Sequence, residues 1–117
     1  MRLDRADLTC QKGWYAGPWN SDLTVSVGYA NEGIDDPHVH TKVTEIYMVA
    51  RGESVMRVGH ESFSLTEGDM LTLDPGEPHT FLSSSPGYFH FVLHVPGLPE
   101  DEVQAERLAV SRSDLGL

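Results

Sequence analysis

The sequence predicts an all-β protein, built as an antiparallel barrel or sandwich of short strands. Apolar and small polar residues alternate along residues 23–29, which is the pattern of a strand with one buried face. Residues 45–49 are rich in β-formers. Turns that contain glycine or proline recur about every eight to twelve residues, a spacing typical of antiparallel β domains.

The expected elements follow in order. Residues 1–12 are mixed and charged and suggest a short leading strand or arm. Pro37 forbids a helix at the residue before it, which favours an extended entry to His38. A tight hairpin is expected at Gly59, and His60 beside it should be exposed. Further strands are expected over residues 45–49, 54–58, 62–65, 70–73, 80–83 and 88–95.

After Pro96 the composition changes, and a short helix is expected. Acidic residues at 100–102 complement the helix dipole, and residues 103–109 are good helix formers. Residues 111–117 are expected to fray or to cross to a partner subunit. We predict one domain over residues 1–117, with its core over 20–96 and a C-terminal extension over 97–117.

Length and charge restrict the possible functions. A chain of 117 residues can bury roughly two-thirds of its unfolded surface, which is enough for one core. The formal net charge of −10 argues against binding to a nucleic-acid backbone, which needs clustered Lys and Arg. The first residues lack the apolar core of a signal peptide, and no apolar run approaches the ~18 residues that span a bilayer. We therefore expect a cytoplasmic protein with no nucleic-acid or membrane partner.

The sulfur-containing residues are expected to be structural. The single cysteine, Cys10, cannot form an intrachain disulfide and should be a buried or semi-buried thiol. Met48, Met56 and Met70 are expected to fill the core.

A set of nitrogen and oxygen donors suggests a metal site. His38 and His40 are two residues apart, so both imidazoles leave the same face of an extended strand. Glu45 has the opposite parity and can join them only if the chain turns or bulges around residues 42–44. His79 follows a Pro/Gly turn. Three imidazoles and one carboxylate suit a first-row divalent metal.

These residues occur in two motifs that resemble those of the cupin superfamily. His38 to Gly52 matches the first motif, H-x-H-x4-E-x6-G, and Gly68 to His79 resembles the second. The short interval between the motifs is typical of small cupins. The sequence departs from the family pattern at three places. The interval between Gly33 and His38 is one residue shorter than usual, Asp74 occupies the usual proline position, and Ser83 occupies the usual asparagine position.

The resemblance implies a jelly-roll barrel that binds one divalent transition metal (Fe, Mn, Ni, Co or Zn) and forms a homodimer. It assigns the metal ligands as His38, His40, Glu45 and His79. We expect a small metal-dependent enzyme of the dioxygenase or isomerase/lyase type, with a small organic substrate. The alternatives are a non-catalytic module that binds a sugar-like molecule, and a metal that only stiffens the barrel.

Other residues are candidates for the pocket. Tyr47 has the parity of Glu45 and should face the interior if Glu45 does. His90 and His94 share one strand face, and alternation alone does not show whether that face or the phenylalanine face lines the interior. We take Tyr47, His90 and His94 as candidate catalytic residues. The aromatic cluster from Trp14 to Trp19 is either a lid, a dimer contact or a surface for the ligand.

Overall fold

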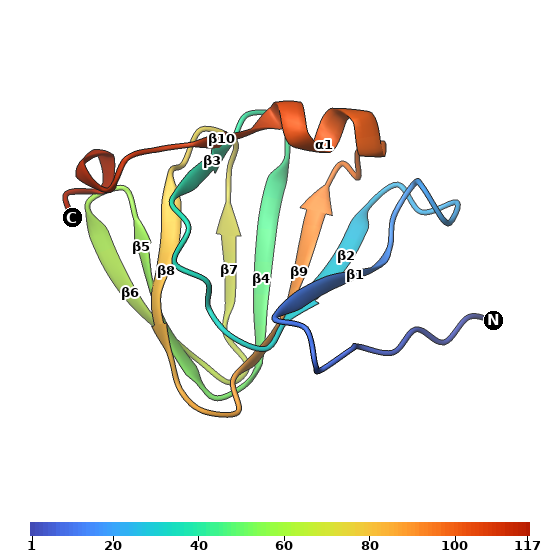
Figure 1. Cartoon of the computed structure of the whole chain (residues 1–117), viewed down its shortest axis with the longest axis horizontal. Helices are drawn as coiled ribbons and strands as arrows, with labels where there is room; N and C mark the ends of the chain where they lie inside the picture. Colours follow the sequence, from blue (N-terminus) through green and yellow to red (C-terminus); the bar gives the residue numbers. More distant parts are fainter.

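Two five-stranded antiparallel sheets form the opposite walls of a barrel (Figure 1). The structure is a computed structural model that describes residues 1–117. The first sheet has the order β1 (Lys12–Ala16), β2 (Ser26–Ala30), β9 (Phe89–Val95), β4 (Thr44–Arg51), β7 (Met70–Leu73). The second has the order β10 (Arg107–Ala109), β3 (His38–His40), β8 (His79–Ser84), β5 (Glu53–Val58), β6 (Glu61–Thr66). The predicted antiparallel jelly-roll barrel is confirmed.

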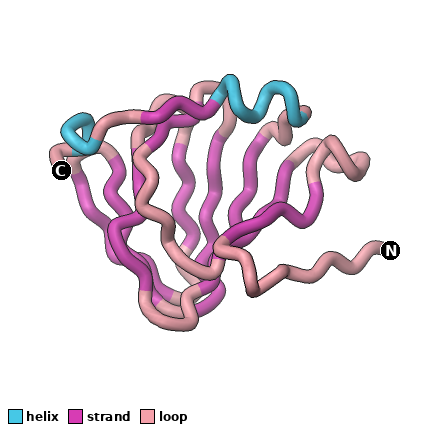
Figure 2. Tube along the Cα trace, viewed as in Figure 1, coloured by secondary structure: helices cyan, strands magenta, loops and turns pink.

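The chain crosses repeatedly between the two walls, as the tube in Figure 2 shows. β3 belongs to one sheet and β4 to the other, so the chain changes sheets at residues 41–43. It returns after Gly52, whose φ of 76° lies in the left-handed region that glycine adopts without strain. β5 and β6 form the predicted hairpin through Gly59, and His60 is exposed as expected.

Inward side chains change from polar to apolar along the same strands. On β4 the buried positions are Glu45, then Tyr47, then Val49, and on β8 His79 precedes Phe81. The apolar positions meet in one core cluster between the sheets. One part of the interior is therefore a hydrophobic core, and another part is lined by titratable groups. The core cluster comprises Tyr47, Val49, Met56, Leu65, Leu73, Phe81 and Tyr88.

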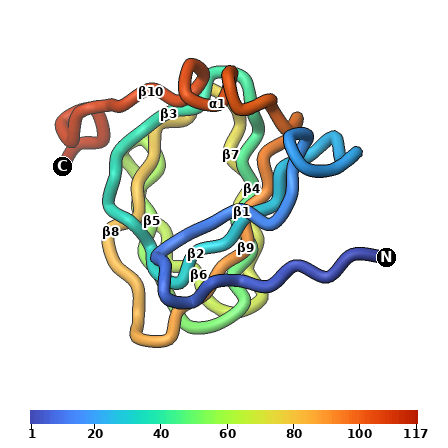
Figure 3. The backbone as a smooth tube through the Cα atoms, turned by 45° about the vertical axis from the view of Figure 1, so that its right-hand side comes forward, coloured from blue at the N-terminus to red at the C-terminus, as the bar shows by residue number.

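The C-terminal segment lies across one end of the barrel (Figures 1 and 3). The predicted helix is α1 (Glu100–Glu106), and it ends earlier than the helix-forming run suggests. Residues 107–109 instead pair with β3 as β10. This pairing satisfies backbone groups that an uncovered β3 edge would leave open. No helix of the chain has the length and apolar character needed to cross a membrane.

The expectation that residues 111–117 fray is wrong. A 3-10 helix, η1 (Arg112–Leu115), begins with a capping box between Ser111 and Asp114. Leu115 is fully buried, and Nε of Arg57 donates a hydrogen bond to its carbonyl at 2.8 Å. The segment is held by burial and by a hydrogen bond to β5 of the same chain.

Three further expectations are corrected. Cys10 is exposed, because it lies in a surface turn before β1 with Asp7. Met70 is 64% exposed because β7 is an edge strand and this residue faces outward, whereas Met56 is fully buried and Met48 half-buried. The strand expected to start at Leu23 starts at Ser26, which leaves Leu23 exposed.

Candidate metal centre

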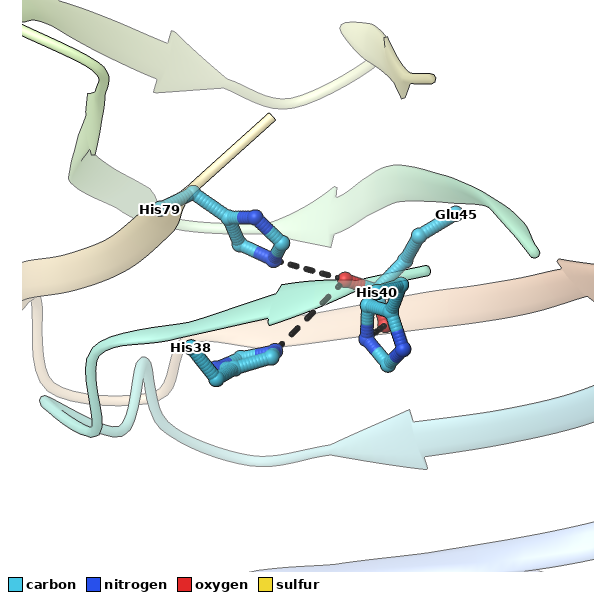
Figure 4. Close-up of side chains that lie close together, drawn as sticks. All are labelled: His38, His40, Glu45 and His79. Carbon is cyan, nitrogen blue, oxygen red and sulfur yellow. Dashed lines mark hydrogen bonds and ion pairs between the residues drawn. The ribbon is translucent and has the colours of Figure 1, made fainter. Parts of the chain in front are cut away.

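Four side chains from strands of both sheets converge in one cluster (Figure 4). His38 and His40 come from β3, His79 from β8 and Glu45 from β4. One ligand atom of each lies within 4.8 Å of the others. The structure therefore brings together all four residues that the motifs single out.

Glu45 reaches the histidines from the opposite wall. The sequence required a turn around residues 42–44, and the chain changes sheets there. A single straight strand would have placed Glu45 on the far face. Val43 is buried in this crossing, which fixes the approach to β4.

Hydrogen bonds to backbone carbonyls orient two of the imidazoles. Nδ1 of His38 donates to the carbonyl of Asp36 at 2.7 Å, and Nδ1 of His79 donates to that of Glu77 at 2.9 Å. A carbonyl oxygen only accepts, so the proton is on Nδ1 in both rings. Nε2 is therefore the nitrogen that each ring offers to the cluster, as in many metal-binding histidines.

His40 is oriented by a carboxylate that sequence reasoning missed. Nδ1 of His40 lies 2.5 Å from Oε2 of Glu106, the last residue of α1. The other oxygen of Glu106 accepts hydrogen bonds from the backbone N–H groups of Lys42 and Val43, both at 3.2 Å. Burial favours the neutral acid, but these donors outweigh it and lower the pKa of Glu106 below its usual value.

Glu45 is the anion at the centre of the cluster. Its Oε1 accepts from the hydroxyl of Tyr47 at 2.8 Å and lies 2.8 Å from Nε2 of His79. Its Oε2 accepts from Nε2 of His94 at 2.6 Å. Burial opposes the charge, yet the contacts with His40, His79 and His94 hold the pKa of Glu45 well below its usual range.

The donor set fits a divalent cation. Nδ1 of His79 is engaged with the carbonyl of Glu77, and its Nε2 lies 2.8 Å from a carboxylate oxygen of Glu45. Nε2 of His40 is buried without any hydrogen-bond partner. Burial lowers the pKa of His38 to about 4, which leaves its ring neutral near pH 7. A divalent cation would give Nε2 of His40 a partner and would take the other two imidazoles and the carboxylate as further ligands.

The structure separates the three candidate catalytic residues. Tyr47 and His94 both contact Glu45, whereas His90 lies deeper in the core. His90 stacks on Phe81 at 5.2 Å, and its Nδ1 lies 2.9 Å from the hydroxyl of Tyr88. The histidine face of β9 therefore lines the interior, which alternation could not decide.

A cavity of about 330 Å³ adjoins the cluster beneath α1. Trp14 and Trp19 form part of its wall, together with His94 and Glu106. The latter two also contact Glu45 and His40, so the cavity lies directly beside the candidate metal centre. The aromatic cluster that the sequence left unassigned thus belongs to the rim of this cavity.

The fold and the His/Glu cluster define a cupin, a double-stranded β-helix with a cluster that could hold a metal inside the barrel. The chain belongs to the AraC-like ligand binding domain family, whose model matches residues 23–110. A comparison with curated proteins found no match.

Solved structures with the same fold include a protein with bound uridine and a synthase. A variant of Streptomyces Pac13 with uridine is 16% identical, with 86% of this chain and 77% of that chain covered and a TM-score of 0.68. Ectoine synthase from P. lautus is 19% identical, with 92% and 80% covered and a TM-score of 0.62. A Klebsiella pneumoniae protein with a double-stranded β-helix domain is 26% identical, with 74% of each chain covered and a TM-score of 0.56.

Proposed function

We propose that the chain is a metal-dependent enzyme of the isomerase/lyase type that acts on a small organic molecule in the cavity beneath α1. The observation that carries this proposal is the position of His94. Its Nε2 donates to Glu45 in the cluster, and its side chain also lines the cavity. His94, a residue type that can transfer protons, thus lies between the candidate metal ligands and the cavity that would hold the substrate.

Four residues would hold the metal: His38, His40 and His79 through Nε2, and Glu45 through its carboxylate. Three neutral nitrogens and one carboxylate suit Fe, Mn, Ni, Co or Zn. When bound, such an ion supplies Lewis-acid chemistry that polarises an oxygen of the substrate.

The surrounding residues have distinct roles in this proposal. Nδ1 of His94 makes no hydrogen bond within the chain, so it is free to accept a proton from a bound molecule or to return one. Burial and the charge of Glu45 raise the pKa of Tyr47 well above its usual value. Tyr47 therefore stays protonated and holds Glu45 in place as a donor, without exchanging protons itself.

Dioxygenase chemistry uses the same kind of ligand set, so the experiment has to separate the two reactions. The protein would be loaded with Fe, Mn, Ni, Co or Zn in turn and screened against small organic molecules, with product analysis and oxygen uptake measured together. We expect turnover that depends on metal and not on oxygen. His94→Gln should reduce turnover by about 10²- to 10⁴-fold while bound metal stays constant. Turnover that consumes oxygen would contradict the proposal.

A second candidate is a non-catalytic ligand-binding module, which the family match favours because that family is described as ligand binding. In this case a bound molecule would be recovered unchanged, and its affinity would survive removal of the metal. The enzyme proposal expects instead that the bound molecule is converted and that this turnover is lost on chelation.

The assembly and the location of the protein are also proposals. A homodimer is supported by the open edge strand β1 and by the exposed apolar side chains on the N-terminal arm, Leu3 and Leu8. Light scattering coupled to size exclusion tests it, since a monomeric mass would contradict it. We expect the protein to act in the cytoplasm, which fractionation of its host cell would test.

A further inference from the structure

We propose that the cavity beneath α1 binds a small organic cation, such as the amine, guanidinium or alkylammonium end of a substrate. This inference rests on the proposed function, because the cavity is the place where the substrate of that reaction would lie. It adds the charge class of the molecule, which the ligand set alone does not give.

Two indole rings form one corner of the cavity. The rings of Trp14 and Trp19 are 5.9 Å apart between centroids and nearly perpendicular, at 82°. Both side chains remain partly open to solvent, with Trp14 44% exposed and Trp19 36% exposed. Perpendicular aromatic faces around a pocket are the arrangement that binds alkylated ammonium groups through their ring quadrupoles.

Two glycines allow the indole rings to pack closely against the backbone, because a side chain at either position would clash with a ring. A Cβ atom on Gly28 would lie 2.8 Å from the ring of Trp14, and one on Gly17 would lie 2.2 Å from the ring of Trp19. Trp14 also packs edge-to-face with the ring of His94, with centroids 4.9 Å apart. The corner is therefore held in place by close packing against the backbone and does not depend on a ligand.

The charged groups around the cavity are acidic. Glu100 and Glu106 line it, and no lysine or arginine does. Glu106 is already engaged with His40 and with two backbone N–H groups, so Glu100 is the carboxylate that remains available. At the Glu100 side of the cavity, an anionic group would meet this carboxylate with no lysine or arginine to compensate it, whereas a cationic group would be attracted by it.

A serine hydroxyl completes the cavity. Ser26 is 2% exposed, lines the same space and makes no side-chain hydrogen bond within the chain. Because Ser26 lines the cavity and its hydroxyl has no partner within the chain, this hydroxyl is available to a hydrogen-bonding group of the bound molecule. The cavity thus offers aromatic faces, one free carboxylate and one hydroxyl.

The test compares three probes of similar shape: choline, its neutral carbon isostere, in which carbon replaces the nitrogen, and the anion pivalate. The protein has two tryptophans, both in the cavity wall, so the indole N–H resonances in nitrogen–proton correlation spectra report binding directly. We expect saturable shifts with choline, about fivefold weaker binding of the isostere and none with pivalate. Absence of saturable choline binding, equal binding of the isostere, or preference for pivalate would each overturn the inference.

Matched variants separate the carboxylate from the helix that carries it. Glu100→Gln should reduce the preference for choline over its isostere, whereas Asp101→Asn removes a charge from the same first turn of α1 and should keep the full preference. Trp19→Leu should remove choline binding. Unchanged discrimination in the Glu100→Gln protein would also overturn the inference.

The titrations would be run on metal-loaded and on chelated protein. Trp14, Trp19 and Glu100 are not part of the ligand cluster, so the preference for choline should persist without metal. If the cation preference holds but no metal-dependent turnover exists, the proposed function fails and the binding site stands. If turnover exists but choline does not bind, only the binding inference fails.

Discussion

Nδ1 of His40 lies 2.5 Å from Oε2 of Glu106, so a residue at the end of α1 sets the orientation of an imidazole in the candidate metal centre. Both side chains are nearly inaccessible to solvent. A carboxylate in this position fixes the tautomer of the ring and increases the basicity of Nε2. The C-terminal extension is therefore part of the site as well as a cover for the barrel.

Glu106→Gln tests this relationship. The amide has one acceptor oxygen, so it cannot serve both His40 and the backbone N–H groups of Lys42 and Val43. We expect the affinity for divalent metal to fall by about 10- to 100-fold with the barrel still folded, as for other orienting carboxylates. Competition with a chelator measures the affinity, and Asp101→Asn on the same helix is the control. Unchanged affinity would show that Glu106 is only a packing residue.

Removal of the metal tests the ligand set itself. His38→Ala combined with His40→Ala should abolish stoichiometric metal, measured by elemental analysis, while the circular dichroism of the barrel is retained. In the unsubstituted protein, metal at 100 times its dissociation constant should add about 2.7 kcal/mol to the free energy of unfolding, and chelation should reverse this. The double variant should not respond to chelator. His60→Ala, at an exposed histidine, is the control, and full occupancy in the double variant would refute the ligand assignment.

Most of the fold and the ligand set could be predicted from the local sequence, because turns, alternation and the two motifs are short-range features. Glu45 could also be assigned in this way. Its parity required a turn at residues 42–44 if it was to join the histidines, and the chain does change sheets there. Glu106 could not be found in this way. Its distance from His40 depends on the pairing of β10 with β3, which the helix-forming sequence of residues 103–109 conceals.

Other misassignments arose where tertiary position decides burial. Met70 follows the apolar pattern of a strand, but β7 is an edge strand and the side chain faces outward. Leu115 lies in a short polar segment that appeared prone to fraying, yet it is fully buried. Periodicity in such short segments does not show whether Met70 or Leu115 is buried, because the surface that would cover each side chain is formed by residues far away in the sequence.

Leu115→Ala measures how much the C-terminal segment contributes to stability. Truncating a fully buried leucine removes its apolar contacts and leaves a cavity, so the free energy of unfolding should fall by about 2–4 kcal/mol. Leu117→Ala, two residues later and 42% exposed, should change it by less than about 0.5 kcal/mol. Urea denaturation of both proteins provides the comparison. Equal and small losses would mean that the segment is not docked in solution.

The last prediction concerns His90 and the stability of the barrel in acid. Burial lowers the pKa of His90 to about 4, whereas an unfolded histidine titrates near 6.5. Between these values the unfolded chain binds more protons than the folded one, so the stability conferred by the neutral ring is complete above about pH 6.5. It is lost as the pH falls toward 4, by roughly 3 kcal/mol in all.

His38, whose pKa is also lowered to about 4, contributes in the same pH window, so the His90 contribution is obtained by comparing metal-free parent and His90→Gln proteins at several pH values between 4 and 7. His90→Gln should have a dependence of unfolding free energy on pH that is shallower by about 1.4 kcal/mol per unit in this window, because one proton-linked group is gone. Glutamine can still form a hydrogen bond with the hydroxyl of Tyr88, which limits the loss of packing. His60→Gln leaves the buried imidazole in place and should keep the original slope. If His90→Gln also kept that slope, the ring would not be buried in its neutral form.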